Sequence, residues 1–275
     1  MVRAFAAALA VTLASTSLAW CQRLSDADAA ALIEKSRERA LSYAKSLPDF
    51  VCTEVVRRYQ QNRPASARMW RQLSVQTPTA WTPTDKLTIK LSFFEQKEDH
   101  KLVLLNEKPT GLKYESLGGG TGSGEFGGTL RNIFDPQAQA VFHWQAWRNV
   151  RRHRAALYTY NVDTEHSLFE VESGASGGIR KAIVAFHGDL EIDSDTGDVL
   201  HFTYVADQIP KELNLNYVST SVDYDLADVG GRDYLLPMHA RMEIFSPALS
   251  VRNDIDFRDY RKFSADSSIE FGPGK

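Results

Sequence analysis

The feature that most constrains this fold is an alternation of apolar and polar residues with a period of two, which begins near residue 50. In "KLTIKLSFF", the apolar residues Leu87, Ile89, Leu91 and Phe93 alternate with polar ones, which is typical of a half-buried β-strand. Similar segments such as "AVFHWQAWRNV", "VLHFTYVAD" and "LPMHARMEIF" follow, separated by turn signals such as "DSDTG" and "VGGRD". About ten short strands with turn-length connections predict a mainly β (α+β) fold, built as an antiparallel meander.

One amphipathic helix is predicted before these strands. Ser25 followed by Asp28 is a capping-box pattern, and Pro48 ends the helical spacing. We expect a leading helix over residues 26–47. Its apolar stripe consists of Ala29, Leu32, Ile33, Ser36, Ala40, Tyr43 and Leu47.

A glycine-rich break interrupts the meander at "SLGGGTGSGEFGG". Glycine costs backbone entropy in a folded segment, so we expect a mobile connection here. The residues that follow have helical spacing and end near Pro136. The apolar side chains of this short amphipathic helix are Phe126, Leu130, Ile133 and Phe134.

The first residues, "MVRAFAAALAVTLASTSLAWC", have the layout of a secretory signal peptide: one Arg, an apolar run, then small residues. Ordinary cleavage after Ala19 would make Trp20 the new N-terminus. A lipoprotein signal would instead acylate Cys21, but the residue before the acylated Cys should be small and here is Trp20. We therefore predict a signal peptide over 1–19 and a periplasmic or secreted protein, with anchoring through Cys21 as the alternative.

Composition limits the partners and the number of domains. The net charge of −3 comes from interleaved acids and bases, whereas nucleic-acid binding favours a strongly basic face. No later segment approaches membrane-spanning length. The hydrophobic content of 43% suffices for a sizeable core. We expect one β domain over 20–264 and a tail over 265–275.

The two cysteines, Cys21 and Cys52, invite a disulfide in an exported protein. The helix between them would be ~30 Å long, and the flanking residues span that length only when almost fully stretched. A bridge is therefore strained, and Cys52 is better explained as a small buried hydrophobe. Acylation of Cys21, a free thiol and a bridge all remain open.

Three short motifs match known signatures, and each has a simpler explanation. "GASGG" (174–178) fits a serine nucleophile elbow at Ser176, but a predicted strand follows where a helix is required. "GSGEFG" (122–127) fits a dinucleotide loop but has no βαβ context. "DSDTGD" (193–198) suggests a calcium loop but lacks the closing Glu, so a hairpin turn explains it better. We expect no cofactor.

The strongest metal or acid–base candidate comes from strand register. If Leu190, Ile192, Leu200 and Phe202 face the core, Glu191 lies across from His201 on the other face. That face then gathers His187, Asp189, Glu191 and His201. Two imidazoles and two carboxylates suit zinc or a general base. Opposite charges across strands are equally ordinary on a solvated face.

A basic run, "RNVRRHR", marks a predicted turn between two strands. It could contact lipid headgroups or an acidic partner, or be a solvated turn. Trp144 and Trp147 precede it and, being three residues apart, should lie on opposite faces of their strand. The basic residues are Arg148, Arg151, Arg152 and Arg154.

Taken together, the leading helix, the "LPDFVCTEVVRRYQ" strand and the hairpins at 192–200 and "YDLADVGGRDYLLP" resemble the periplasmic lipoprotein-carrier superfamily of LolA, LolB and the N-terminal domain of RseB. Uncharacterised secreted bacterial proteins share the LPDF, GEFG and RKFSADS signatures. The resemblance implies an unclosed barrel whose concave face binds acyl chains or is capped by helices. The short helix after the glycines would then be a lid over that face.

Three hypotheses for function follow. The first is an exported, non-catalytic binding protein of the bacterial envelope that holds an apolar ligand, an acyl chain or a segment of a lipidated or envelope partner in the concave face. The second is a hydrolase or metal-dependent enzyme that uses the His187, Asp189, Glu191 and His201 face. The third is a structural envelope component. The resemblance favours the first, with peripheral membrane contact at most.

Overall fold

The computed structural model describes residues 23–62, 80–118, 120, 124–175, 178–247 and 249–263. The helices are α1 (Asp26–Ser46) and α2 (Gly128–Phe134), with 3-10 turns η2 (Tyr114–Leu117), η3 (Pro136–Ala138) and η4 (Lys211–Leu213). The strands are β1 (Phe50–Asn62), β2 (Thr82–Phe94), β3 (Lys97–Leu105), β4 (Lys108–Pro109), β5 (Val141–Val150), β6 (His153–Val162), β7 (Glu170–Ala175), β8 (Gly178–Ile183), β9 (Ala185–Asp193), β10 (Val199–Asp207), β11 (Tyr217–Asp228), β12 (Asp233–Phe245) and β13 (Leu249–Lys262).

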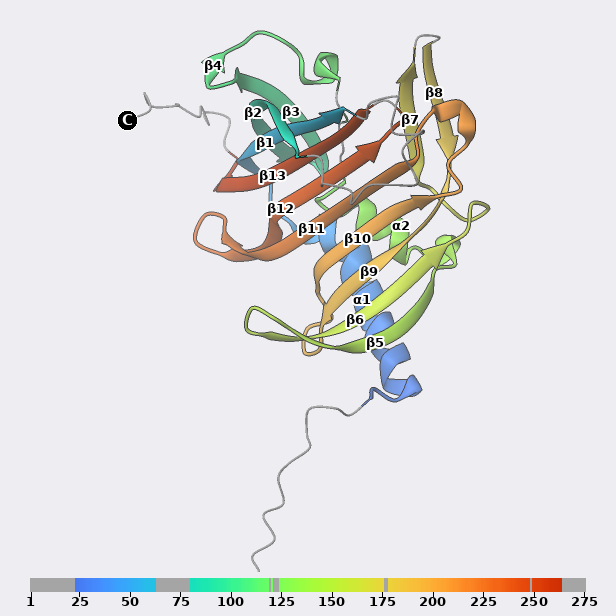
Figure 1. The fold of residues 1–275 in the computed structure, drawn as a ribbon. Coiled ribbons are helices and arrows are strands. Elements are labelled where there is room, and N and C mark those ends of the chain that lie inside the picture. The colour runs from blue at the N-terminus through green and yellow to red at the C-terminus, as the bar shows by residue number, and fades with distance from the viewer. Residues whose placement is uncertain are drawn as a thin grey trace, which may run out of the picture.

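Eleven of these strands form one antiparallel sheet, in the order β4-β3-β2-β1-β13-β12-β11-β10-β9-β6-β5 (Figure 1). The edge strands β4 and β5 do not pair with each other, so the sheet is unclosed, as the sequence predicts. It is not one continuous meander, because β1 pairs with β13 and joins the two ends of the described chain. Strands β7 and β8 form a separate hairpin inserted between β6 and β9.

Helix α1 begins and ends where the sequence predicts. Ser25 caps it by accepting a hydrogen bond from the amide of Asp28 at 3.1 Å, and the helix stops two residues before Pro48. The helix runs along one face of the sheet, which we call the inner face. It reaches from β6, where Tyr158 donates to the carbonyl of Ala29, to β12.

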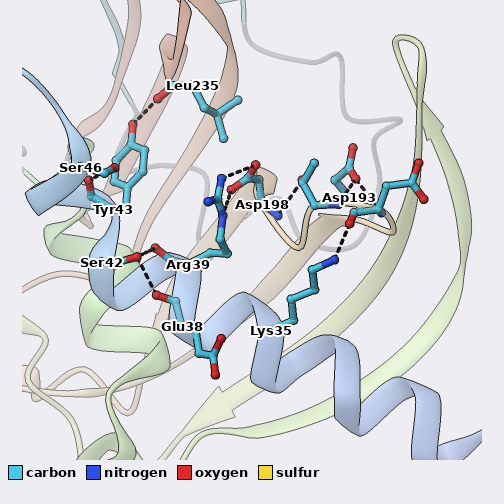
Figure 2. Close-up of polar contacts among 11 residues, drawn as sticks. Lys35, Glu38, Arg39, Ser42, Tyr43, Ser46, Asp193, Asp198 and Leu235 are labelled. Carbon is cyan, nitrogen blue, oxygen red and sulfur yellow. Dashed lines mark hydrogen bonds and ion pairs between the residues drawn. The ribbon is translucent and has the colours of Figure 1, made fainter.

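Polar contacts fix α1 to the hairpin between β9 and β10 (Figure 2). Arg39 makes a bidentate pair with Asp198, at 2.7 and 2.9 Å, and Lys35 donates to the carbonyl of Asp195. Farther along α1, Tyr43 donates to the carbonyl of Leu235 in β12 at 2.8 Å. Gly197 permits this approach, because a Cβ there would lie 2.8 Å from the side chain of Lys35.

The "DSDTGD" stretch is the turn of this hairpin. Asp193 Oδ1 accepts from the amides of Asp195 and Thr196, both at 2.8 Å, as aspartates do in turns. The interpretation as a hairpin turn is confirmed, and the turn's structural role is to hold α1.

The core lies between the inner face and the two helices. It contains the alternating apolar residues of β2 and the inner residues of β6, β9, β10 and β11. Helix α2 ends at Phe134, just before Pro136, as predicted. Phe126, in the turn before α2, packs against Phe50, Phe93 and Phe257, with ring centroids 5.2 to 6.0 Å apart.

Two β-bulges change the predicted facing of side chains. The register shifts between Val199 and His201, so Val199, not Leu200, lies opposite Ile192 and joins the core. A second shift, between Trp144 and Ala146, places both Trp144 and Trp147 against the core. Their rings are 6.3 Å apart. The prediction that the two tryptophans face opposite ways is wrong, because an extra residue in one strand reverses the alternation.

Several predictions fall on residues outside the described ranges. These include the signal peptide over 1–19, Trp20, Cys21, the tail over 265–275, Ser176, and part of the glycine-rich run. Cys52 is described, and it is buried without a disulfide partner among the described residues. Within those same residues, no helix combines the length and apolarity needed to span a bilayer.

Candidate functional site

The inner face is covered at one end of β11 and open at the other. Tyr224 and Val222 belong to the core beneath the helices. Two and four residues farther back along the strand, Thr220 and Val218 lie on the same face but line a cavity of about 1520 Å³. Alternation therefore continues the apolar surface of the core into the floor of this cavity.

Several parts of the chain border the cavity, among them Tyr114 and Gly118 after β4. The floor comes from strands β9 to β12, and the walls from β7, from the β2–β3 hairpin and from the exposed edge of α2. The floor residues are Phe186, Tyr204, Val218, Thr220, Met242 and Ile244. The wall at β7 includes Val171 and, just before the strand, Leu168 and Phe169. A cavity of this size, apolar on its floor, is suited to a small apolar molecule or an acyl chain.

A cluster of ionisable side chains lies beside the cavity, where β1 and β3 meet the turn before α2. On β3, Glu98 and His100 line the cavity. Glu54 on β1 points to the same face, since it alternates with the core residues Cys52 and Val56. We call Glu54, Glu98, His100 and Glu125 the acid cluster.

Two carboxylate oxygens of the acid cluster, Glu54 Oε2 and Glu98 Oε2, are buried without a hydrogen bond among the described residues. His100 Nε2 lies 3.5 Å from Glu54 Oε2 and 4.0 Å from Glu98 Oε2, which is longer than a good hydrogen bond. Buried acceptors of this kind are uncommon and costly.

Burial dominates the electrostatics of the cluster. It raises the pKa of Glu54 to about 8, and repulsion from Glu125 and Glu98 acts in the same direction. Burial and the charge of Glu125 raise the pKa of Glu98 to about 7, although amides of Gly124 and Phe126 stabilise its charged form. Burial also raises the pKa of Glu125. The cluster therefore holds protons near neutral pH.

Another buried charge on the same strand is fully paired. Arg58 Nε and Nη2 bind the two carboxylate oxygens of Asp85, both at 2.6 Å, and Nη1 donates to the carbonyl of Gly118 at 2.5 Å. This bidentate arrangement is the strongest form of ion pair. Burial alone thus does not explain the missing partners of Glu54.

The predicted lid residues lie together on the inner face. Leu130, Ile133 and Phe134 of α2 and Phe126 before it are buried in the core. Phe134 stacks on Phe142 of β5, with centroids 5.4 Å apart. Of the four, only Phe126 also lines the cavity, so α2 borders the cavity with its opposite edge, which includes Gly128, Arg131 and Asn132.

The predicted polar face is present on the outer side of the sheet. Glu191 lies across from His201, as predicted. Each histidine, however, binds an aspartate outside the predicted set: His187 pairs with Asp207 at 2.5 Å and His201 with Asp223 at 2.8 Å. In the described parts of the chain, no group of three or more His, Cys, Asp or Glu side chains is arranged to hold a metal ion.

The basic run forms the predicted turn between β5 and β6. Arg148 and Arg152 are exposed. Arg151 pairs with Asp225 at 3.2 Å and donates to the carbonyl of Tyr224. Arg154 lies 3.8 Å above the ring of Trp147. Two of the four arginines thus already contact the protein itself.

Sequence reasoning missed the acid cluster. The available signal was a charged residue in an inward-facing position: Glu54 between Cys52 and Val56, and Glu98 and His100 in step with Leu102. The strands β1 and β3 and the turn before α2 are far apart in the sequence, and no sequence motif connects them. Their meeting is set by the β1–β2–β3 register, in which Glu54 is opposite Ile89 and His100 is opposite Leu91.

Comparison with known proteins finds similar solved structures. One is a LolA superfamily protein from Nitrosomonas europaea, with a TM-score of 0.32 and 8% identity, covering 86% of this chain and 94% of that one. Another is a DUF1329 family protein from Desulfovibrio piger, with a TM-score of 0.35 and 11% identity over 86% and 95%. A third is a putative outer membrane lipoprotein-sorting protein domain from Vibrio parahaemolyticus, with a TM-score of 0.35 and 8% identity over 86% and 93%.

All three likenesses are distant, at 8 to 11% identity. With TM-scores below 0.5, none of them assigns a ligand, a partner or a site to this chain. No family model matches the sequence, and no curated protein matches it.

Proposed function

We propose that this chain is an exported, non-catalytic binding protein of the bacterial envelope that holds an apolar ligand or acyl chain on its inner face. The observation that supports this is the cavity of about 1520 Å³, whose floor continues the apolar inner face of β9 to β12. Covering that floor with an acyl chain would remove apolar surface from water, at roughly 25 cal/mol per Å².

We further propose that α2 acts as the lid of this site. Its apolar stripe packs in the core, while its other edge forms a cavity wall. A bound chain would therefore lie beside α2, and a bulkier one would push α2 outward. The glycines before the helix would permit this movement, as small residues do at hinges.

The proposal includes export and a single β domain over residues 20–264. The signal-peptide layout of residues 1–19 supports cleavage before Trp20. Mass spectrometry of the mature protein should find Trp20 at the N-terminus, whereas a diacylglyceryl group on Cys21 would show membrane anchoring instead.

Binding of a fluorescent fatty-acid probe tests the proposed function. Val218→Arg places a charge on the cavity floor and should weaken probe binding at least about tenfold, because the arginine must displace the acyl chain or be buried beside it. Leu226→Arg is the matched control on the same strand, since Leu226 is 58% exposed and does not line the cavity.

The control variant should bind the probe like the unchanged protein. Circular dichroism should show that both variants keep the sheet. If the unchanged protein binds neither this probe nor an equally long apolar chain with another head group, the carrier proposal fails and a structural or partner-binding role becomes the better explanation.

A further inference from the structure

The acid cluster borders the cavity beside its apolar floor. Glu98 and His100 line the cavity directly, together with Tyr114, whose ring stacks on His100 at 5.9 Å. Glu54 lies behind them, with only 4% of its side chain exposed. A ligand tail on the floor of β11 and β12 would thus have its head beside Glu98 and His100.

The acid cluster contains three carboxyl groups and one basic side chain, His100. The carboxyl groups of Glu54 and Glu98 lie 3.5 and 4.0 Å from the His100 imidazole, and the Oε2 atoms of both accept no hydrogen bond within the described residues. Buried polar atoms usually have a hydrogen-bond partner. A bound group that donates to Glu54 Oε2 would supply the partner that this atom lacks among the described residues. A group with several N–H donors and a positive charge would satisfy the oxygens and the charge together.

We propose that the acid cluster is a subsite for the primary ammonium head of an amphiphile whose apolar tail occupies the cavity. This inference rests on the proposed function and specifies its ligand. An anionic head is disfavoured there, because it would approach Glu98, with Glu54 behind it. A neutral head would supply no counter-charge to the ionised form of these carboxyl groups.

The charges around the cavity agree with this assignment. Its lining includes the acids Glu98, Asp99, Glu170 and Glu172 against the cations Lys97 and Arg131. Lys181 already pairs with Glu170 and Glu172, both at 2.9 Å. An excess of one sign in a cleft attracts ligands of the other sign.

The raised pKa values supply a further expectation. A bound ammonium would favour the ionised form of Glu98 and Glu54, so binding near pH 7 should release about one proton. The titratable groups that face Glu54 or its neighbours are Cys52 on β1, Glu98 and His100 on β3, Glu125 before α2, Tyr43 on α1, Tyr224 on β11, and Asp259 and Tyr260 on β13.

Three probes with the same twelve-carbon tail separate the head from the tail: dodecylamine, dodecyltrimethylammonium and dodecanoic acid. Each is titrated calorimetrically at monomeric concentrations and pH 7. Dodecylamine should bind at least about tenfold more tightly than dodecanoic acid, which corresponds to one charge-assisted hydrogen bond. Dodecyltrimethylammonium carries the charge without N–H donors and should fall between them.

The variant Glu98→Gln tests whether Glu98 binds the ammonium head, and Glu95→Gln is its control. Glu95 is exposed in the same β2–β3 hairpin and does not line the cavity. Glu98→Gln should remove most of the preference for dodecylamine, while Glu95→Gln should leave it unchanged. Titrations of the unchanged protein in buffers of different ionisation enthalpy should show proton release with dodecylamine only.

The outcomes distinguish the subsite from the carrier function. Equal binding of all three probes, or of the two cationic probes, would overturn the ammonium subsite and leave the carrier function standing. Absence of proton release would also overturn the subsite, even if Glu98→Gln failed to fold. If none of the probes binds, the carrier function itself is refuted.

Discussion

Charged side chains are paired differently on the two faces of the sheet. On the outer face, three His–Asp pairs connect neighbouring strands through Nδ1 contacts of 2.5 to 2.8 Å: His187–Asp207, His201–Asp223 and His239–Asp256. On the inner face, His100 is 3.5 Å or more from its carboxylates, and two carboxylate oxygens of the acid cluster lack a hydrogen-bond partner among the described residues.

The two faces differ in what an unsatisfied polar group costs in stability. A polar pair on a solvated face costs little because water solvates whatever the pair leaves unsatisfied. An unsatisfied carboxylate in the interior has no such compensation. Cross-strand packing explains the outer pairs, whereas it does not explain the acid cluster.

The largest expected effect compares two neighbouring arginines of β1. Arg58 is on the inner face and pairs with Asp85, while Arg57 is on the outer face and pairs with Asp256 at 2.5 Å. Arg58→Met should lower the free energy of unfolding by about 3–5 kcal/mol, because it leaves Asp85 without its counter-charge. Arg57→Met should cost about 0.2–1 kcal/mol.

Urea denaturation of both variants measures this contrast. Equal losses for the two arginines would mean that the inner face is as well solvated as the outer face. The explanation of the acid cluster by burial would then fail.

A smaller effect is expected at Glu54, and it depends on pH. The folded protein holds the Glu54 proton up to about pH 8, whereas the unfolded chain releases it near pH 4.5. This contribution to stability is therefore complete below pH 4.5 and is lost as the pH rises toward 8. Between pH 5 and pH 7 the loss should be about 2 kcal/mol.

Glu54→Gln should remove this loss, so the variant becomes more stable relative to the unchanged protein as the pH rises. Denaturation at pH 5 and pH 7 checks the difference, with the exposed Glu95→Gln as control. A difference between Glu54→Gln and the unchanged protein that does not vary with pH would show that Glu54 titrates normally.

The smallest effects are expected on the outer face. Replacing His187, Asp189, Glu191 or His201 with alanine should change the free energy of unfolding by less than about 0.5 kcal/mol. Burial lowers the pKa of His201, but the hydrogen bond and charge of Asp223 outweigh it and raise the pKa. The contribution of this pair should therefore be present in acid and fade as the pH rises past the pKa of folded His201.

Thermal unfolding at pH 5 and pH 8 measures the His201→Ala effect. A cost above about 2 kcal/mol, or metal bound to the unchanged protein, would show that the outer face resembles the inner one.

Local pattern predicted the elements of this fold, but not how distant strands meet. The capping box of Ser25, the stop before Pro48 and the alternation in β2 depend on neighbouring residues, and the structure has the elements that they predict. The pairing of β1 with β13 and the facing of Trp144 and Trp147 depend on long-range register and bulges. The acid cluster was missed for the same reason, because three separate segments bring its members together.

The pairing of β1 with β13 also has a kinetic consequence. Val56 lies opposite Ile255, so the first strand of the sheet finds one of its two neighbours only in the last strand. Contacts this distant in sequence are slow to form. A chain that crosses a membrane from its N-terminus would present β1 with one open edge until its last strand had followed. If this chain is exported as proposed, we expect it to stay unfolded, and to depend on chaperones, throughout translocation.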